Sequence, residues 1–160
     1  MNKFHKVSYE QYAKDRNLCD DVAMAEYEAI KLPHRGTAYS AGYDFYAPFD
    51  FTLPPGNTIQ FFTGIRMELD KDKWLACYPR SGLGFKYHVM LANTVGVIDA
   101  DYFTAKNEGH IGVKLYNGGD KFLHVKAGEA FMQGVISPYY LTVDDDADGI
   151  REGGFGSTGR

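Results

Sequence analysis

Hydrophobic and polar positions alternate with a period of two along much of the chain after Ser40. In the clearest case, from Ile59 to Leu69, apolar residues at every second position alternate with residues that include Arg66 and Glu68. Successive side chains of a strand point to opposite faces, so this period is typical of a strand with one buried face. We therefore expect a single strand over this stretch.

Turn sequences divide the remainder into short runs. Pro-Pro-Gly-Asn, Asn-Gly-Gly-Asp and Lys-Ala-Gly-Glu lie at residues 54–57, 117–120 and 126–129. Strand-like runs are expected over residues 74–78, 111–116 and 130–136. Many short strands at such spacing, together with 12 Tyr and 11 Phe, predict a mainly β domain, a sandwich or jelly roll.

The chain divides into three parts. A capping-box pattern from Ser8 to Gln11 predicts a helix from Tyr9, and a second helix is expected to end before Pro33. Residues 1–33 are thus predicted to be a short helical N-terminal appendage that serves packing or assembly. Residues 34–143 are the predicted β domain, and residues 144–160, acidic and then glycine-rich, are the predicted flexible C-terminal arm.

Length, charge and cysteine content narrow the class of protein. A chain of 160 residues fits one domain, and a net charge of -4 argues against nucleic acid as a partner. Cys19 and Cys77 lack metal-ligand spacing and favour a reducing compartment. The N-terminus lacks a signal-peptide pattern and no apolar run is long enough to span a membrane. We expect a cytoplasmic protein without membrane association.

The densest polar stretch is Gly-Val-Ile-Asp-Ala-Asp-Tyr, at residues 96–102. It places two carboxylates, Asp99 and Asp101, and the ring of Tyr102 between strand-like segments, shortly after Asn93. This density suits a binding pocket better than a core, and we interpret the stretch as a nucleotide-binding hairpin.

Other motifs supply chemistry that the hairpin lacks. Pro-Arg-Ser-Gly-Leu-Gly at residues 79–84 is either a glycine-rich turn with a solvated arginine or a site that holds phosphate oxygens. The terminal Gly-x-Gly-x-x-Gly at residues 154–159 matches a dinucleotide fingerprint, but no helix follows it, so a Rossmann fold is rejected. Asp44 after a glycine, and Gln133 on an apolar strand, are more often structural when considered alone.

In their order along the chain, these segments resemble the homotrimeric deoxyuridine triphosphatases (dUTPases). Ala-Gly-Tyr-Asp, Pro-Arg-Ser-Gly-Leu, Asn-x-x-Gly-Val-Ile-Asp-x-Asp-Tyr, a Gly-Glu…Gln strand and Gly-Gly-Phe-Gly-Ser-Thr-Gly cover residues 41–159. The resemblance implies a jelly-roll-like β-barrel. It also implies hydrolysis of dUTP to dUMP and pyrophosphate, which limits uracil in DNA and supplies dUMP for dTTP synthesis.

The resemblance also implies a role for each motif residue. Asp99 would be the general base for the water that attacks the α-phosphorus, with Arg80 and Gln133 as the other catalytic residues. Tyr102 would lie against the deoxyribose and Phe155 would stack on the uracil. The remaining substrate-binding residues would be Ser81, Gly82, Asn93, Val97, Ile98, Gly112, Arg151, Gly156, Ser157 and Thr158.

Magnesium and neighbouring chains complete the implied site. Mg2+ would be held mainly by the triphosphate and waters, with Asp44 as an outer-sphere contact. In this family three chains share each pocket, so a homotrimer is implied.

Some residues depart from the family pattern. The link over residues 103–110 is longer than usual, Ala130 stands where arginine is common, and Arg151 is one residue closer to Phe155 than in the commonest spacing. Arg160 is an alternative to Arg151 as a phosphate contact.

Two alternatives to dUTP hydrolysis remain open. One is the related dCTP deaminase activity, against which Gly82 and Asp99 argue. The other is an interaction module that binds a regulatory protein through residues 1–30 or through the insertion, which is the long link over residues 103–110. This second role is compatible with catalysis.

Overall fold

The computed structural model describes residues 1–151. The helices are α1 (Tyr9–Arg16), α2 (Asp20–Ala29), α3 (Ser81–Tyr87) and the 3₁₀ helix η1 (Ala100–Thr104). The first six strands are β1 (Lys3–Lys6), β2 (His34–Arg35), β3 (Tyr43–Tyr46), β4 (Phe51–Leu53), β5 (Thr58–Phe62) and β6 (Ile65–Glu68). The others are β7 (Lys73–Pro79), β8 (Val89–Leu91), β9 (Gly96–Asp99), β10 (Gly112–Asn117), β11 (Leu123–Val125) and β12 (Ala130–Pro138).

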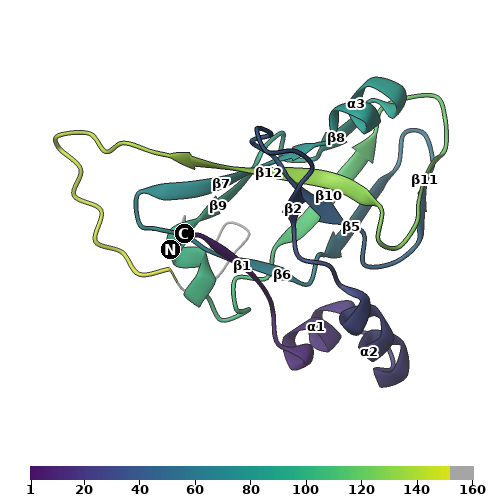
Figure 1. Cartoon of the computed structure of the whole chain (residues 1–160), viewed down its shortest axis with the longest axis horizontal. Helices are drawn as coiled ribbons and strands as arrows, with labels where there is room; N and C mark the ends of the chain where they lie inside the picture. Colours follow the sequence, from purple (N-terminus) through teal and green to yellow (C-terminus); the bar gives the residue numbers. More distant parts are fainter. Residues whose placement is uncertain (152–160) are drawn as a thin grey trace.

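Two sheets form most of the β domain. One has the strand order β2-β3-β12-β7-β9 and the other the order β5-β10-β8, and the pairs β1-β6 and β11-β4 complete the fold. Figure 1 shows α1 and α2 together beside the sheets, away from α3. One hydrophobic core joins these parts, since it contains Val7, Phe45, Leu75, Leu115 and Phe131. The predicted mainly β fold class is confirmed.

The single strand expected from Ile59 to Leu69 is wrong, because the chain breaks at Gly64. Strand β5 pairs with β10, whereas β6 pairs with β1. Between them Gly64 has a φ of +77°, a left-handed conformation that other residues rarely adopt. Alternation continues through the break, so the pattern alone did not reveal the change of partner.

The N-terminal segment contains both predicted helices, and it also contributes a strand. The side chain of Ser8 accepts a hydrogen bond from the Gln11 N–H, as the capping-box pattern predicted. Strand β1 lies antiparallel to β6, and Val7, Tyr12 and Ile30 are buried in the shared core. Residues 1–33 are therefore packed into the same core as the β domain.

The glycine-rich turn considered for residues 79–84 is also wrong, because a helix begins at Ser81. The carbonyl of Arg80 accepts hydrogen bonds from Leu83 N and Gly84 N, both at 3.0 Å. Leu83 and Tyr87 lie one turn apart and pack on the hydrophobic core. This packing stabilises α3 despite its two glycines.

The insertion after Tyr102 depends on a glycine at position 109. Gly109 has a φ of +69°, and a Cβ there would lie 2.6 Å from the Tyr102 carbonyl oxygen. We expect Gly109→Ala to lower the free energy of unfolding by about 2–4 kcal/mol, since strain and a backbone clash both contribute. Urea unfolding measures this loss.

Gly56 provides the matched control. Its φ is +72°, but nothing lies within 4 Å of a Cβ added there. Gly56→Ala is therefore expected to lower the free energy of unfolding by about 1 kcal/mol, through backbone strain alone. Equal losses in the two variants would contradict the predicted clash.

Candidate active site

The site begins where β8 and β9 separate. A tight turn follows β8, in which Leu91 O accepts a hydrogen bond from Thr94 N at 2.9 Å. Strand β8 then belongs to the sheet of β10, while β9 pairs with β7 in the other sheet. The predicted hairpin is therefore wrong as a paired hairpin, and its two arms lie in different sheets.

A pocket of about 260 Å³ lies between the separated strands. Its lining is mostly apolar, with a few polar groups. The lining residues are Gln60, Cys77, Leu91, Ala92, Asn93, Gly96, Ile98, Ile111, Gly112, Val113, Lys114 and Met132. The structure thus brings together Asn93, Ile98 and Gly112, three of the predicted substrate-binding residues, around one cavity.

Two strand edges border this pocket. Strand β9 is the last strand of its sheet, and β8 pairs with β10 only from Leu115 to Asn117. Backbone N–H and C=O groups at such edges are strong hydrogen-bonding groups. A planar ligand with donors and acceptors on its rim suits the space between them.

Asp99 ends β9, Asp101 lies in η1, and the two carboxylates share one cation. The Arg151 guanidinium donates to the Asp99 carboxylate through Nη2 and to Asp101 Oδ1 through Nε at 2.7 Å. Its centre is 5.9 Å from the centroid of the Tyr102 ring. The side chain of Asp99 is 46% exposed, so its carboxylate remains accessible to solvent. Arg151 was predicted to contact phosphate, whereas in the structure its guanidinium is bonded to the carboxylates of Asp99 and Asp101.

A second cluster lies at the other end of β7. Arg80 Nε is 3.0 Å from Asp44 Oδ1, and Gln133 Nε2 donates to Pro79 O at 3.1 Å. Pairing of β12 with β3 aligns Gln133 with Asp44. Ser81 and Gly82 are exposed at the start of α3, and nothing lies within 4 Å of a Cβ added at Gly82. The predicted phosphate-binding residues are therefore grouped in space.

The two clusters are far apart within one chain. Asp99 is aligned with Trp74, at the start of β7, whereas Arg80 follows the end of that strand. Six residues of extended chain separate these positions, which corresponds to about 20 Å. One chain therefore does not bring Arg80 next to Asp99.

Comparison with known proteins identifies the family of this chain. The model of the dUTPase family matches residues 28–159. The deoxyuridine 5'-triphosphate nucleotidohydrolase of Lactococcus lactis is 38% identical over 134 residues, which cover 81% of this chain and 89% of the relative. The chain belongs to the dUTPase family.

Solved structures agree with this assignment. The crystal structure of dUTPase from Streptococcus mutans has 31% identity and a TM-score of 0.66, covering 87% of this chain and 97% of its own. A mutant dUTPase from phage phi11 of S. aureus, described with a structural Mg(II) ion, has a TM-score of 0.66 over 93% and 97% of the two chains. At 16% identity, that second likeness supports the fold alone.

The structure does not describe four of the predicted substrate-binding residues, and a fifth, Val97, points away from the pocket side of β9. Phe155, Gly156, Ser157 and Thr158 lie outside the described residues. Val97 is 57% exposed, and by alternation along β9 its side chain points away from the side of Ile98.

Cys77 is a pocket residue that was not among the predicted site residues. It lies on β7 opposite Gly96, and burial raises the pKa of its thiol to about 12. The alternation of β7 was the available signal, because it places Cys77 on the same side of the sheet as Leu75. The thiol is therefore an unreactive part of the pocket floor.

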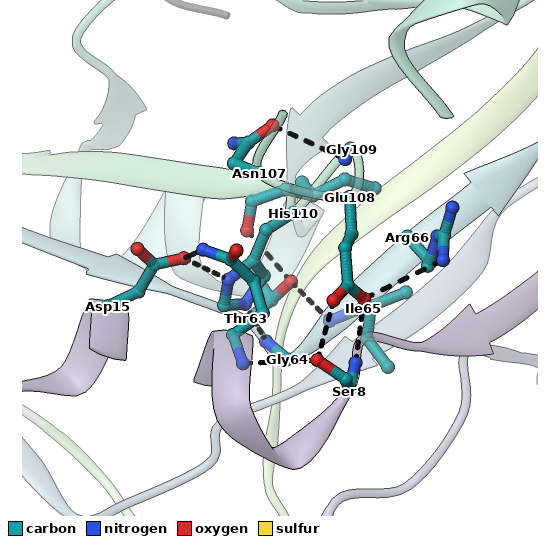
Figure 2. Close-up of polar contacts among 12 residues, drawn as sticks. Ser8, Asp15, Thr63, Gly64, Ile65, Arg66, Asn107, Glu108, Gly109 and His110 are labelled. Carbon is teal, nitrogen blue, oxygen red and sulfur yellow. Dashed lines mark hydrogen bonds and ion pairs between the residues drawn. The ribbon is translucent and has the colours of Figure 1, made fainter. Parts of the chain in front are cut away.

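The insertion of this dUTPase is bonded to the N-terminal helix α1, as Figure 2 shows. His110 is fully buried, and its Nε2 accepts the Gly64 N–H at 2.8 Å. That bond makes Nδ1 the protonated nitrogen, which donates to Asp15 Oδ2 at 2.6 Å. Glu108 meanwhile accepts from Ser8 N, at 2.8 Å, and from Ser8 Oγ.

Because His110 is buried, we expect the free energy of unfolding of the protein to depend on pH. Burial lowers its pKa from the usual 6.5, although Asp15 opposes this shift. The unfolded chain then binds more protons than the folded one, so the free energy of unfolding falls as pH drops below 6.5. His110→Gln is expected to flatten this decline between about pH 5 and pH 6.5, measured by urea unfolding at each pH.

His124→Gln is the control, because it removes an exposed histidine. It should retain the slope of the unmodified protein. An unchanged slope in His110→Gln would contradict the assignment to His110.

Proposed function

We infer that this dUTPase-family chain hydrolyses dUTP to dUMP and pyrophosphate by attack of water on the α-phosphorus. One observation carries the proposal: a pocket bordered by two strand edges is lined by Ile98, and the next residue of β9 is Asp99, whose carboxylate is accessible to solvent. Nucleotide hydrolysis requires a pocket that binds the nucleobase and, next to it, a general base that activates water.

Asp99 is the proposed general base. It accepts the proton of the attacking water, while Arg151 orients its carboxylate together with that of Asp101. Arg80 and Gln133 bind and position the phosphate groups, with Ser81 and Gly82 as further contacts. Positioning and charge neutralisation then supply most of the acceleration.

Selectivity for uracil is proposed to come from the pocket. Asn93 and the backbone of Val97, Ile98 and Gly112 donate to and accept from the base edge. A mismatched base would cover these polar groups without pairing them, which costs more than a lost apolar contact. The ring of Tyr102 lies against the deoxyribose and leaves no room for a 2′-hydroxyl.

The residues near Asp44 fit a hydrated magnesium ion. Among the described residues no group of three or more His, Cys, Asp or Glu side chains is arranged to hold a metal. A single carboxylate at Asp44, paired with Arg80, suits contact through water. When bound with the triphosphate, Mg2+ would neutralise phosphate charge, and Arg80 would hold the same phosphates in place.

A homotrimer with shared sites is proposed from the separation of the two clusters. About 20 Å of strand lies between Asp99 and Arg80 of one chain, which supports the proposal that the Arg80 acting with a given Asp99 comes from another chain. The sheet face that carries Asp99 also exposes apolar side chains, with Val97 57% and Tyr78 36% exposed. Such residues suit burial between subunits.

Substrate selectivity tests the proposed function. We expect dUTP to be hydrolysed, with magnesium present, at least 100-fold more efficiently than dTTP, dCTP or UTP. Pyrophosphate release measures all four. Equal turnover of dUTP and dTTP would refute the role of the pocket, and ammonia release from dCTP would revive the deaminase alternative.

Location and regulation remain predictions. Cys19 and Cys77 are both free, which is consistent with a reducing compartment such as the cytoplasm. Within residues 1–151 no helix is long and apolar enough to cross a membrane. A regulatory protein that binds the N-terminal segment or the insertion also remains a prediction.

A further inference from the structure

The hydroxyl group of Tyr102 is engaged within its own chain. Tyr102 Oη donates to the His110 carbonyl at 2.8 Å and accepts from Asn107 Nδ2 at 2.8 Å. Burial raises the pKa of Tyr102, so the phenol keeps the proton that it donates. Tyr102 as a whole is 7% exposed. In the proposed function the sugar meets the ring of Tyr102, while the hydroxyl bonds that ring to the insertion.

Asn107 bonds to the insertion as well as to Tyr102. Its Oδ1 accepts from Gly109 N at 3.3 Å, and the Tyr102 carbonyl accepts from Ala105 N at 3.0 Å. The amide thus joins the tyrosine hydroxyl to the turn at Gly109. Its position depends on how firmly the insertion is held.

The insertion is held at both ends by residues distant in the sequence. At its start, Arg66 Nη2 donates to Phe103 O at 2.6 Å and its guanidinium lies 3.7 Å from the Phe103 ring centroid. At its end, His110 is fixed between Gly64 and Asp15. Figure 2 shows Arg66, Glu108 and Ser8 bonded in sequence on one side of this network and Asp15 with His110 on the other.

We propose that Asn107 is a positioning residue that fixes the Tyr102 ring and thereby sets discrimination against a 2′-hydroxyl. The proposal rests on the role of Tyr102 in the proposed function. A steric barrier to one oxygen atom works only when the ring is held within a fraction of an ångström. Without the amide donor, the hydroxyl keeps only the His110 carbonyl, and the ring can tilt.

The test is the ratio of kcat/KM for dUTP to that for UTP. In Asn107→Leu the side chain keeps about the same size, but it can neither donate to Tyr102 nor accept from Gly109. We expect this variant, Asn107→Ala and Tyr102→Phe each to lower the ratio by about fivefold or more, mainly through a lower KM for UTP. Adding Asn107→Ala to Tyr102→Phe should change the ratio no further, because the hydroxyl through which Asn107 acts is already absent.

Asn57 supplies the control, since its amide also bonds within a turn, to Pro55 O at 3.1 Å. Asn57→Ala should leave the ratio unchanged. If both Asn107 variants lower the melting temperature but retain the ratio, Asn107 is only structural and the proposal is wrong. If Tyr102→Leu retains the ratio, the role of Tyr102 in the proposed function is wrong instead.

Discussion

Asn in place of Asp99 is expected to lower kcat by roughly 10²–10⁴-fold, the usual contribution of a general base. The amide has the size of the carboxylate, so the fold and the pocket should persist. Because the change affects proton transfer, the affinity for a non-hydrolysable dUTP analogue should change much less. Pyrophosphate release and calorimetric titration with the analogue measure the two effects separately.

Asp101→Asn is the matched control for Asp99→Asn. Both acids bond to the same Arg151 guanidinium, so either substitution removes one of its ion pairs. Asp101→Asn is expected to lower kcat by about tenfold at most, because it alters only the support of the base. If the two variants lose the same activity, the effect comes from Arg151 and Asp99 is not the base.

Mixing two inactive variants is expected to restore activity. In Arg80→Ala the phosphate cluster is damaged, and in Asp99→Asn the base is lost. If each site takes Asp99 from one chain and Arg80 from another, random trimers from an equal mixture contain intact sites at about one quarter of positions. Activity after joint unfolding and refolding should therefore reach about a quarter of the unmodified value.

The unmixed variants, refolded separately and then combined without exchange, are the control and should remain inactive. A refolded mixture that stays inactive would show that both residues act from the same chain. That result would contradict the shared site while leaving the activity itself in place.

Local signals predicted much of the fold. Glycine, proline and asparagine mark the turns before β5 and after β10, and the Ser8 cap marks the start of α1, because each acts within a few residues. The choice of strand partner is not local. Alternation could not show that β5 and β6 pair with different strands, or that β8 and β9 belong to different sheets.

In the candidate site, too, local motifs predicted the residues but not the contacts between distant parts of the chain. The motifs predicted which residues would gather, and the structure places Asn93, Ile98 and Gly112 on one pocket and Asp44, Arg80 and Gln133 in one cluster. The contacts of the insertion were not predicted, since Ser8 and Glu108 are 100 positions apart and Asp15 and His110 are 95 apart. No period or motif reports such pairings.

The end of the β7–β9 ladder at Asp99 determines where this chain can change in length. A single residue gained or lost within β9 would turn Asp99 to the opposite face of the sheet, because side chains alternate along a strand. Beyond Asp99 the backbone leaves the ladder through η1, so residues added after Tyr102 do not alter the pairing before it. We therefore expect a residue inserted within residues 104–106 to leave the hydrolysis of dUTP in place, whereas a residue inserted or deleted within residues 96–99 should abolish it.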